Sequence, residues 1–434
     1  MRSESTYPHW FDGRQIDEIA FVDSLRAMNH MRCIGGVFYQ EDERPLDDRL
    51  LLEMIIQRLS AVTRTGIYKK ARQLLELLRI RCYQEDREPD MTVLAVANGT
   101  LDLPSRQLSE EKQFSLHRFP VAYDPAAPAP CYFQSFISSL LAPEDIPTLQ
   151  EYLGYCLIPT TKAQKMMILV GRGGEGKSTL GRVIQGLWGS QVYNGSLQKV
   201  CTDRFARADL EGRLLLLDDD MRLDALPQTN YLKSLVTLEG KTDLERKGIQ
   251  SYQGTLYARF LCFSNGSLSA LYDRSYGFYR RQLILTTLDR EEGRRDEPFL
   301  AEYMLRELPG IFNWCLEGLY RLVENEFRFT ISPRTAQNLR EAQQEANSAV
   351  EFLDSEGYLV YSAGACASSR ALCAAYRRFC EDNSLKPQSD RAFLSYLKQN
   401  QKQLGVTYTA AIPTIKDKTV RGYVGVRVIQ PPLI

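Results

Sequence analysis

Short apolar stretches alternate with amphipathic ones through the middle of the chain. MMILV, LLLLDDD, RFLCFSN and RRQLILT, all between residues 166 and 286, have the length and continuous apolar character of buried strands. Helical spacing of apolar residues follows the first of them, at Leu180, Val183 and Ile184. Because strands that alternate with helices are typical of a parallel sheet, the pattern predicts an α/β core.

The patterns before and after this core differ from it. The first 90 residues alternate charged and apolar stretches, including GGVFYQ as a predicted strand and RLLLEMIIQRLSAV as a predicted helix, and NGTLDL indicates a turn into a strand. The stretch YDPAAPAPCYF favours a domain boundary ahead of the helix IPTLQEYLGYCLI, and TISPRT marks a second boundary. The helices PFLAEYMLREL and IFNWCLEGLYRLVENEF close the middle section.

The last hundred residues predict two helices and a hairpin. SRALCAAYRRFCEDN and DRAFLSYLKQNQKQL have helical spacing, and VTYTAAIPTIKDKTVRGYVGVRVI reads as a β-hairpin with a basic tip, which is the order of the second half of a winged helix. Between Arg370 and Arg427, eleven Lys and Arg face four Asp and Glu, a bias typical of a nucleic-acid surface. We therefore expect an α+β accessory domain at 1–125, an ATPase domain at 126–330 and a winged-helix DNA-binding domain at 335–434.

Composition adds few constraints. The 434 residues carry 54 Lys and Arg against 54 Asp and Glu, so the net charge identifies no partner. The ten cysteines include no C-x-x-C pair, which favours a reduced, cytoplasmic protein, and we expect Cys373 and Cys380 to be buried on one helix face. Because neither a membrane-length apolar run nor a signal-peptide core is present, no membrane partner is expected.

The stretch ILVGRGGEGKSTLGRV joins the first core strand to its helix and predicts a phosphate site. Gly171, Gly176, Lys177 and Ser178 match G-x-x-x-x-G-K-[ST], in which backbone N–H groups wrap phosphates, the lysine neutralises them and the hydroxyl ligates Mg²⁺. The expected ATP-binding residues are Gly171, Gly173, Gly174, Glu175, Gly176, Lys177, Ser178 and Thr179.

The same stretch also fits G-x-G-x-x-G, the dinucleotide-binding motif, through Gly171, Gly173 and Gly176. That motif requires an acidic residue about 20 positions later, where this chain has VYNGS, and it gives no role to Lys177 and Ser178. We therefore favour a nucleoside triphosphate over a dinucleotide.

Three carboxylates follow the buried strand LLLL. We expect Asp218 to hold Mg²⁺ through water or together with Ser178, and Asp219 to orient or deprotonate the attacking water. Asp220 is an alternative for the second role, because the sequence does not set the register. A solvated strand end is the alternative for all three.

Two further candidates for catalysis follow along the chain. Asn265 ends the strand RFLCFSN, and its amide is placed to contact the γ-phosphate or its water, although an asparagine after a strand is commonly a turn residue. Arg280 and Arg281 precede the next strand, and a guanidinium reaching the γ-phosphate of a neighbouring subunit would stabilise transition-state charge. Surface arginine is the alternative for this pair.

Taken in order, these motifs resemble superfamily 3 helicases, specifically the helicase part of phage and plasmid primase-helicases. The resemblance is carried by EYLGYCLIPTTKAQKMMILVGRGGEGKSTL, the acidic strand, YLKSLVTLEGKTDLERKG, LCFSN and DRSYGFYRR, and it extends from about Val93 to the C-terminus. The first ninety residues resemble, more weakly, the segment that precedes the helicase in short members of that group from mobile elements of Gram-positive bacteria.

The resemblance implies an AAA+-like P-loop ATPase that assembles into a ring, usually a hexamer, and pulls single-stranded DNA with 3′ to 5′ polarity. It implies that GKTDLERKG forms a hairpin in the central channel of the ring, where Lys241, Arg246 and Lys247 grip the DNA backbone. It also implies forked DNA as substrate and a separate primase or origin-binding protein as a partner.

The chain departs from the family in one respect. Residues 1–125 are too short for a primase domain and show no pair of strand-borne carboxylates for a two-metal site, so we expect no primer synthesis. Two other functions remain as alternatives to a helicase. The first is an ATP-switched origin-binding or loading protein without processive unwinding, and the second is a metabolic kinase, against which the basic C-terminal hairpin argues.

Overall fold

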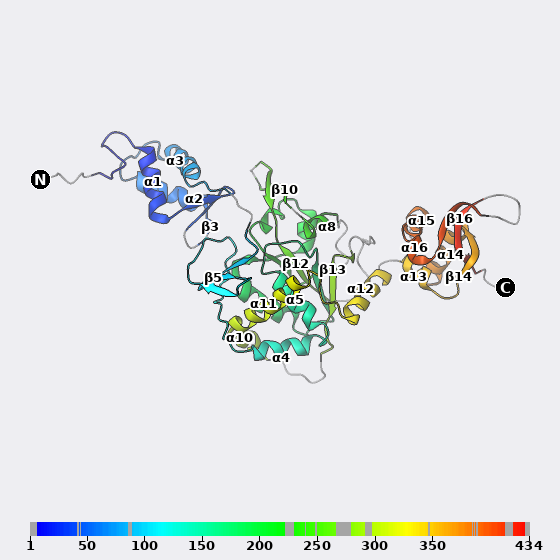
Figure 1. Ribbon diagram of the computed structural model, residues 1–434. Coiled ribbons are helices and arrows are strands. Elements are labelled where there is room, and N and C mark those ends of the chain that lie inside the picture. Colours follow the sequence, from blue (N-terminus) through cyan, green and yellow to red (C-terminus); the bar gives the residue numbers. More distant parts are fainter. Residues whose placement is uncertain are drawn as a thin grey trace.

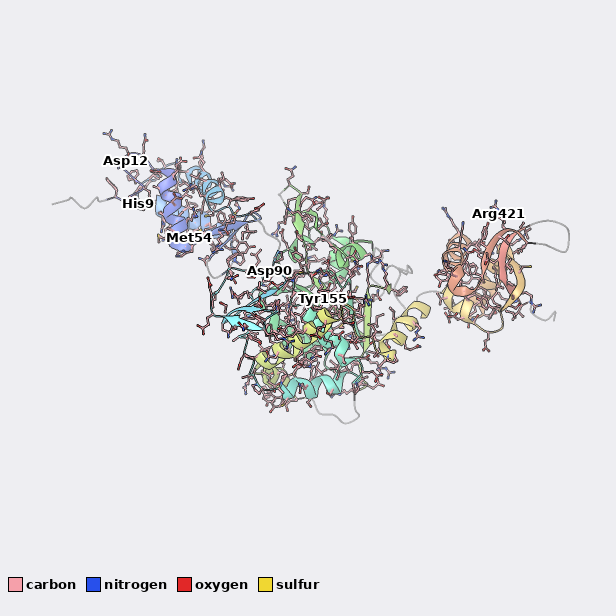
Figure 2. All side chains as sticks on the ribbon, viewed as in Figure 1. His9, Asp12, Met54, Asp90, Tyr155 and Arg421 are labelled. Atoms are coloured by element: carbon pink, nitrogen blue, oxygen red, sulfur yellow. The ribbon has the colours of Figure 1, made fainter. Side chains whose placement is uncertain are left out.

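We analysed a computed structural model of the chain, in which three bodies follow one another in sequence order (Figure 1). The structure describes residues 7–40, 43, 45–85, 89–221, 230–238, 240–247, 250–265, 279–290, 297–345, 348–383, 385, 387, 389–412 and 420–429. Figure 2 labels Met54 in the first body, Tyr155 in the central one and Arg421 in the last. In the described part of the chain, every helix is too short or too polar to span a lipid bilayer.

The first body is a helical unit with a small antiparallel sheet. Its elements are α1 (Glu18–Asn29), β1 (Arg32–Ile34), β2 (Val37–Tyr39), β3 (Pro45–Leu46), α2 (Asp48–Leu59) and α3 (Ile67–Arg81). Asp17 and Asp47 start α1 and α2 by accepting backbone N–H groups of the first turn. The predicted strand at GGVFYQ and the predicted helix α2 are confirmed, whereas α1 and α3 were not predicted. A separate apolar core, from Trp10 to Cys82, holds the unit together.

A three-stranded antiparallel sheet comes next and packs on the central body. Its strands are β4 (Val93–Val96), β5 (Gly99–Asp102) and β6 (Gln107–Ser109). Leu94 and Leu101 belong to the same apolar core as the central helices, as do Phe119 and Val121. Residues 94–121, which we grouped with the N-terminal domain, therefore share the core of the ATPase candidate.

The central body is built on a parallel sheet of five strands in the order β13-β7-β12-β9-β8. Its strands are β7 (Met166–Gly171), β8 (Val192–Asn194), β9 (Leu215–Asp218), β12 (Arg259–Asn265) and β13 (Gln282–Thr286). The four strands predicted from the apolar pattern, and the parallel sheet, are thus confirmed. The chain is a mixed α/β protein.

Helices cover both faces of this sheet. One face carries α4 (Cys131–Leu140), α5 (Ile146–Tyr155), α6 (Lys177–Trp188), α10 (Leu300–Leu305) and α11 (Leu308–Glu324), whose apolar side chains share one core. The other face carries α7 (Leu197–Thr202) and α8 (Asn230–Val236) around a second core. An antiparallel hairpin of β10 (Lys241–Leu244) and β11 (Tyr252–Thr255) projects from the central body (Figure 1). Two short 3-10 turns, η1 (Gly189–Gln191) and η2 (Ala208–Leu210), complete it.

The last body begins after a helix that belongs to the central sheet. That helix, α12 (Pro333–Glu345), lies along β13, where Asn338 Nδ2 donates to the Ile284 carbonyl at 3.0 Å. The last body comprises α13 (Ser348–Asp354), β14 (Leu359–Ser368), α14 (Ser369–Asp382), α15 (Asp390–Gln399), α16 (Gln401–Leu404), β15 (Thr407–Ile412) and β16 (Val420–Val428). The two predicted helices and the hairpin are confirmed. The last body has a separate apolar core, and Cys373 and Cys380 are buried in it, as expected. Strand β14 was not predicted; it pairs with β16 in the order β14-β16-β15.

Candidate functional site

The predicted phosphate loop lies at the C-terminal end of β7, which is flanked by β12 and β13. Gly173, Gly174 and Gly176 have φ angles of 109°, 83° and 115°, a region that glycine enters without steric cost. Gly176 is the N-cap of α6, so the first N–H groups of that helix open toward the loop. Crevices at the carboxyl ends of parallel strands are where open α/β sheets bind ligands. The loop therefore has the backbone shape and the helix N-terminus of an anion site.

Lys177 and Glu175 face each other inside the loop. Lys177 Nζ donates to Glu175 Oε2 at 2.8 Å, and the side chains are 7% and 5% exposed. Glu175 Oε1 accepts the backbone N–H groups of Arg172 and Gly173. A Cβ at Gly171 would lie 2.6 Å from Lys177 Nζ, so a larger residue there would have to displace the ammonium. Ser178 is exposed and Thr179 half-buried in the first turn of α6.

The acidic residues after β9 point to opposite faces of the sheet. Leu216 belongs to the core around α7 and Leu217 to the core around α6. Side chains alternate along a strand, so Asp218 faces α7 and Asp219 faces α6. The contacts agree, because Asp218 Oδ2 accepts the Leu197 N–H of α7 at 2.7 Å.

The Asp219 carboxylate lies beside the phosphate-loop helix. Its Oδ1 is 3.9 Å from the position of a Cβ at Gly181, one turn beyond Ser178. Asp218 is 6% exposed, and burial raises the pKa of its carboxyl, although the Leu197 N–H opposes this rise. Asp219 and Asp220 are both exposed, and the Asp220 N–H points back to Asp218 Oδ1 at 3.4 Å. The roles predicted for Asp218 and Asp219 remain predictions, but the position beside α6 belongs to Asp219.

Asn265 lies next to the phosphate loop across the sheet. The parallel register of β12 and β7 pairs Asn265 with Gly171, and the Asn265 side chain is exposed at the same edge of the sheet. Strand pairing therefore brings Asn265 next to the phosphate loop, although the two are far apart in sequence. The arrangement is compatible with the predicted contact to a terminal phosphate or its water.

Two residues of this edge were missed in the sequence. Thr287 Oγ1 would lie 2.6 Å from a Cβ at Gly171, and Arg290 Nη1 donates to the Gly174 carbonyl at 3.5 Å. Both follow β13, whose parallel pairing with β7 brings its C-terminal end to the loop. Their position just after a core strand was the available signal.

Arg280 and Arg281 lie at the opposite edge of the sheet. They precede β13, and the Arg281 carbonyl accepts the N–H of Met166, the first residue of β7. Strand β7 has six residues at about 3.3 Å each, so roughly 20 Å separates this pair from the phosphate loop. Arg280 is exposed, whereas Arg281 is half-buried, and burial together with the Arg280 charge lowers the pKa of Arg281. Neither guanidinium can serve the loop of its own chain.

The three basic residues predicted to contact DNA are distributed over the β10–β11 hairpin. Lys241 starts β10 at the base, whereas Arg246 and Lys247 follow the strand at the tip. Arg246 donates to Glu211 Oε2 at 2.8 Å and to the Tyr252 hydroxyl at 2.9 Å, and these partners raise its pKa despite partial burial. The hairpin predicted from the resemblance is present, but part of the Arg246 charge is neutralised by Glu211.

Two cation–aromatic groups, which together we call the tip cluster, are joined by the segment 204–207: Arg204 and Lys247 lie at Phe205, and Arg207 lies at Tyr231. Its members are Arg204, Phe205, Arg207, Tyr231 and Lys247. The Arg204 guanidinium carbon lies 4.9 Å and Lys247 Nζ 6.0 Å from the Phe205 ring centre, and the Arg207 guanidinium carbon lies 3.7 Å from that of Tyr231. Tyr231 is 47% exposed. This cluster was not predicted from the sequence, because its residues come from three separate segments of the chain.

Comparison with known proteins agrees with the fold and leaves the activity open. Residues 169–281, from β7 to Arg281, match the model of a family of unknown function (DUF5906). Two apo structures of the C-terminal region of NrS-1 align over 95% and 94% of this chain and 100% of their own, at TM-scores of 0.53 and 0.54 and 10% identity. That identity establishes likeness of fold alone. None of the curated proteins matches the chain significantly.

Proposed function

We propose that the chain is an ATP-dependent DNA helicase of the superfamily 3 type, with an AAA+-like P-loop core, that works as a ring in replicating a phage, plasmid or integrative element. One observation carries the proposal. Lys177, Asp219 and Asn265 converge at one edge of the parallel sheet, while Arg280 and Arg281 lie at the other. If hydrolysis at this phosphate site uses the guanidinium of Arg280 or Arg281, that guanidinium has to come from a neighbouring subunit.

The residues at the C-terminal edge suit a nucleoside triphosphate with Mg²⁺. The loop N–H groups and Lys177 would bind the phosphates, and Asn265 would contact the terminal one. Among the described residues, no group of three or more His, Cys, Asp or Glu is arranged to hold a metal ion. The hard oxygens of Ser178 and one aspartate suit a Mg²⁺ that completes its shell with water and phosphate oxygens. Such an ion neutralises charge on the transferred phosphate.

We assign the carboxylate that faces this Mg²⁺ to Asp219 in preference to Asp218. Asp219 lies beside α6, one turn from Ser178, whereas Asp218 faces α7 and accepts the Leu197 N–H. Asp220 is then the candidate for orienting the attacking water, because it follows directly and is exposed.

The tip cluster and the hairpin support single-stranded DNA as the second ligand. Exposed aromatic rings stack bases and cations bind the phosphates between them, without sequence preference. Tyr231 supplies an exposed ring and Phe205 a half-buried one. Lys247 supplies charge, as do Arg204, which also pairs with Glu245, and Arg207, which also donates to two backbone carbonyls of α7. In a ring, one such surface from each subunit would contact the strand. Primer synthesis is not part of the proposal.

The decisive test is DNA-stimulated hydrolysis of ATP. Wild-type protein is expected to hydrolyse ATP faster with single-stranded DNA, and Lys177→Ala to lose hydrolysis by a factor of at least about 10² because phosphate charge is no longer neutralised. Lys112→Ala, an exposed residue after β6, is the matched control and should retain the wild-type rate. An ATPase rate that is the same with and without DNA would contradict the motor.

The separate core of the C-terminal body favours a second candidate, an ATP-switched origin-binding or loading protein. The body contains α14, α15 and the β15–β16 hairpin around an apolar core of its own, as a winged-helix domain would. Salt-dependent binding of duplex DNA by residues 348–434 alone, which contain the whole C-terminal core, with no strand separation by the whole chain, would support this candidate over the helicase.

A further inference from the structure

The phosphate loop of this chain contains an anion of its own. The Glu175 carboxylate accepts the N–H groups of Arg172 and Gly173 through Oε1 and the Lys177 ammonium through Oε2. These donors are the ones that the proposed nucleotide site would direct at phosphate oxygens. Glu175 is 5% exposed, so its carboxylate lies inside the cradle and away from solvent.

The carboxylate is held there in its charged form. Burial by itself would raise the pKa of Glu175, but the Lys177 ammonium and the loop N–H groups outweigh burial and lower it. A charged carboxylate that accepts charge-assisted hydrogen bonds resembles a phosphate oxygen pair in both charge and geometry.

The donors of the cradle are already engaged by the Glu175 carboxylate. A Cβ at Gly171 would lie 2.9 Å from the Glu175 carboxyl carbon and 2.6 Å from Lys177 Nζ, so both groups are folded tightly over the end of β7. The Arg172 and Gly173 N–H groups each donate along one direction and are already engaged. A phosphate group can use them only after the Glu175 side chain has left.

We propose that Glu175 is an internal competitor for the phosphate site, so that the nucleotide-free loop is closed by its own carboxylate and each phosphate ligand binds by displacing it. The inference rests on the proposed nucleotide site. An alternative role for the same contacts is to hold the loop in its binding shape. The two roles predict opposite signs for the effect of removing the charge.

If Glu175 competes with phosphate, only the molecules with an open cradle can bind a phosphate ligand. The apparent affinity of every phosphate ligand is therefore the intrinsic affinity multiplied by the same fraction, that of molecules with an open cradle. Glu175→Gln keeps the size of the side chain and removes its charge. We expect ADP, ATP and inorganic pyrophosphate each to bind about tenfold more tightly to this variant, the gain typical of losing one competing charge-assisted contact.

The experiment is titration calorimetry of the full chain with ADP and with inorganic pyrophosphate, each with Mg²⁺. Glu302→Gln is the matched control. Glu302 is 41% exposed and pairs with Arg182 of α6. Glu302→Gln changes the net charge of the protein by the same amount as Glu175→Gln. This control should bind both ligands like wild type. Thermal unfolding checks that Glu175→Gln is folded, and Glu175→Ala provides a second variant with the same expected sign.

The outcomes separate the inference from the function it rests on. Tighter binding of both ligands by a similar factor, lost again in Glu175→Gln/Lys177→Ala, supports internal competition. Unchanged or weaker binding in Glu175→Gln and Glu175→Ala, with wild type still binding ADP, overturns it and leaves the nucleotide site intact. Absence of binding in wild type and both variants overturns the proposed function and the inference together.

Discussion

Asp218 and Asp219 are neighbours in sequence, yet they lie on opposite faces of the central sheet. Asp218, the last residue of β9, contacts α7, whereas Asp219, which follows the strand, lies beside the phosphate-loop helix. The sequence alone did not show which of the three consecutive aspartates takes which predicted role, because each of them fits an acidic residue at the end of a buried strand. At the scale of single residues, the structure therefore distinguishes positions that the motif does not.

The different positions of Asp218 and Asp219 predict different hydrolysis rates for their substitution by asparagine. Asp219→Asn should lower the ATP hydrolysis rate by about 10²-fold or more while nucleotide still binds, because the carboxylate proposed to hold Mg²⁺ is lost. Asp218→Asn should retain most of the rate, since its amide oxygen still accepts the Leu197 N–H. Steady-state hydrolysis and ADP titration measure the two effects. The reverse ranking of the variants would place Asp218 at the metal.

Among the elements, helix α7 lies between the two proposed ligand sites. Its first N–H group is held by Asp218, next to the nucleotide edge, and its last turn runs into Arg204 and Phe205 of the tip cluster. A six-residue helix held at its first turn by one side chain is well suited to respond to a change there. The motifs alone did not suggest this connection, because it depends on which face Asp218 occupies.

Removing the Asp218 side chain should therefore affect α7 as a unit. Asp218→Ala leaves the Leu197 N–H without its acceptor, which we expect to cost about 1–3 kcal/mol and to increase hydrogen exchange in α7. Stimulation of the ATPase by DNA should fall with it. Asp218→Asn, which keeps an acceptor, is the control. Normal exchange protection of α7 in the alanine variant would argue against this link.

The tip cluster makes a separate prediction for DNA binding. Phe205→Ala should weaken binding of single-stranded DNA by about 1–3 kcal/mol through lost stacking, and Lys247→Ala should reduce the salt slope by about one. Lys241→Ala, at the base of the same hairpin, tests whether the whole hairpin contacts DNA. Fluorescence anisotropy at several salt concentrations separates these effects. If Phe205→Ala and Lys247→Ala both bind like wild type, the tip cluster is not the DNA surface.

For the whole molecule, the position of Arg280 and Arg281 is the reason why the proposed function includes a second subunit. These arginines lie a strand length from the phosphate loop of their own chain. A reaction that uses the phosphate loop together with one of these arginines therefore needs two subunits, each of which supplies one of the two groups. This property belongs to the sheet as a whole, since it follows from the direction in which β7 and β13 run.

A mixing experiment tests the shared site. Lys177→Ala and the double variant Arg280→Ala/Arg281→Ala should each be inactive alone, but a mixture should recover part of the ATPase activity, because a mixed interface can combine an intact loop with intact arginines. Hydrolysis should also fall on dilution as subunits separate. A mixture as inactive as its components, or a specific activity that does not change on dilution, would contradict assembly.

The parallel core and the phosphate loop were predictable because they rest on local signals. Buried parallel strands read as short apolar runs, and the loop chemistry needs its glycines, Lys177 and Ser178 at fixed spacing in one segment. The helices α1 and α3 and the strand β14 were missed. Helix α3 carries a clear helical signal, because Ala71, Leu74, Leu75 and Leu78 lie on one buried face, whereas β14 is mostly exposed or half-buried and depends on its pairing with β16. Local periodicity also gave no reason to group residues 94–121 with the central core.

The sequence by itself determined the strand, loop and helix of the phosphate site, because backbone geometry over a dozen residues decides them. Tertiary structure decided the rest of the site. Strand pairing placed Asn265 beside Gly171, and strand direction placed Arg281 at the far edge. Side-chain packing turned Glu175 into the cradle. Such placements depend on contacts between distant segments, whose geometry is set only when the sheet and its covering helices pack together.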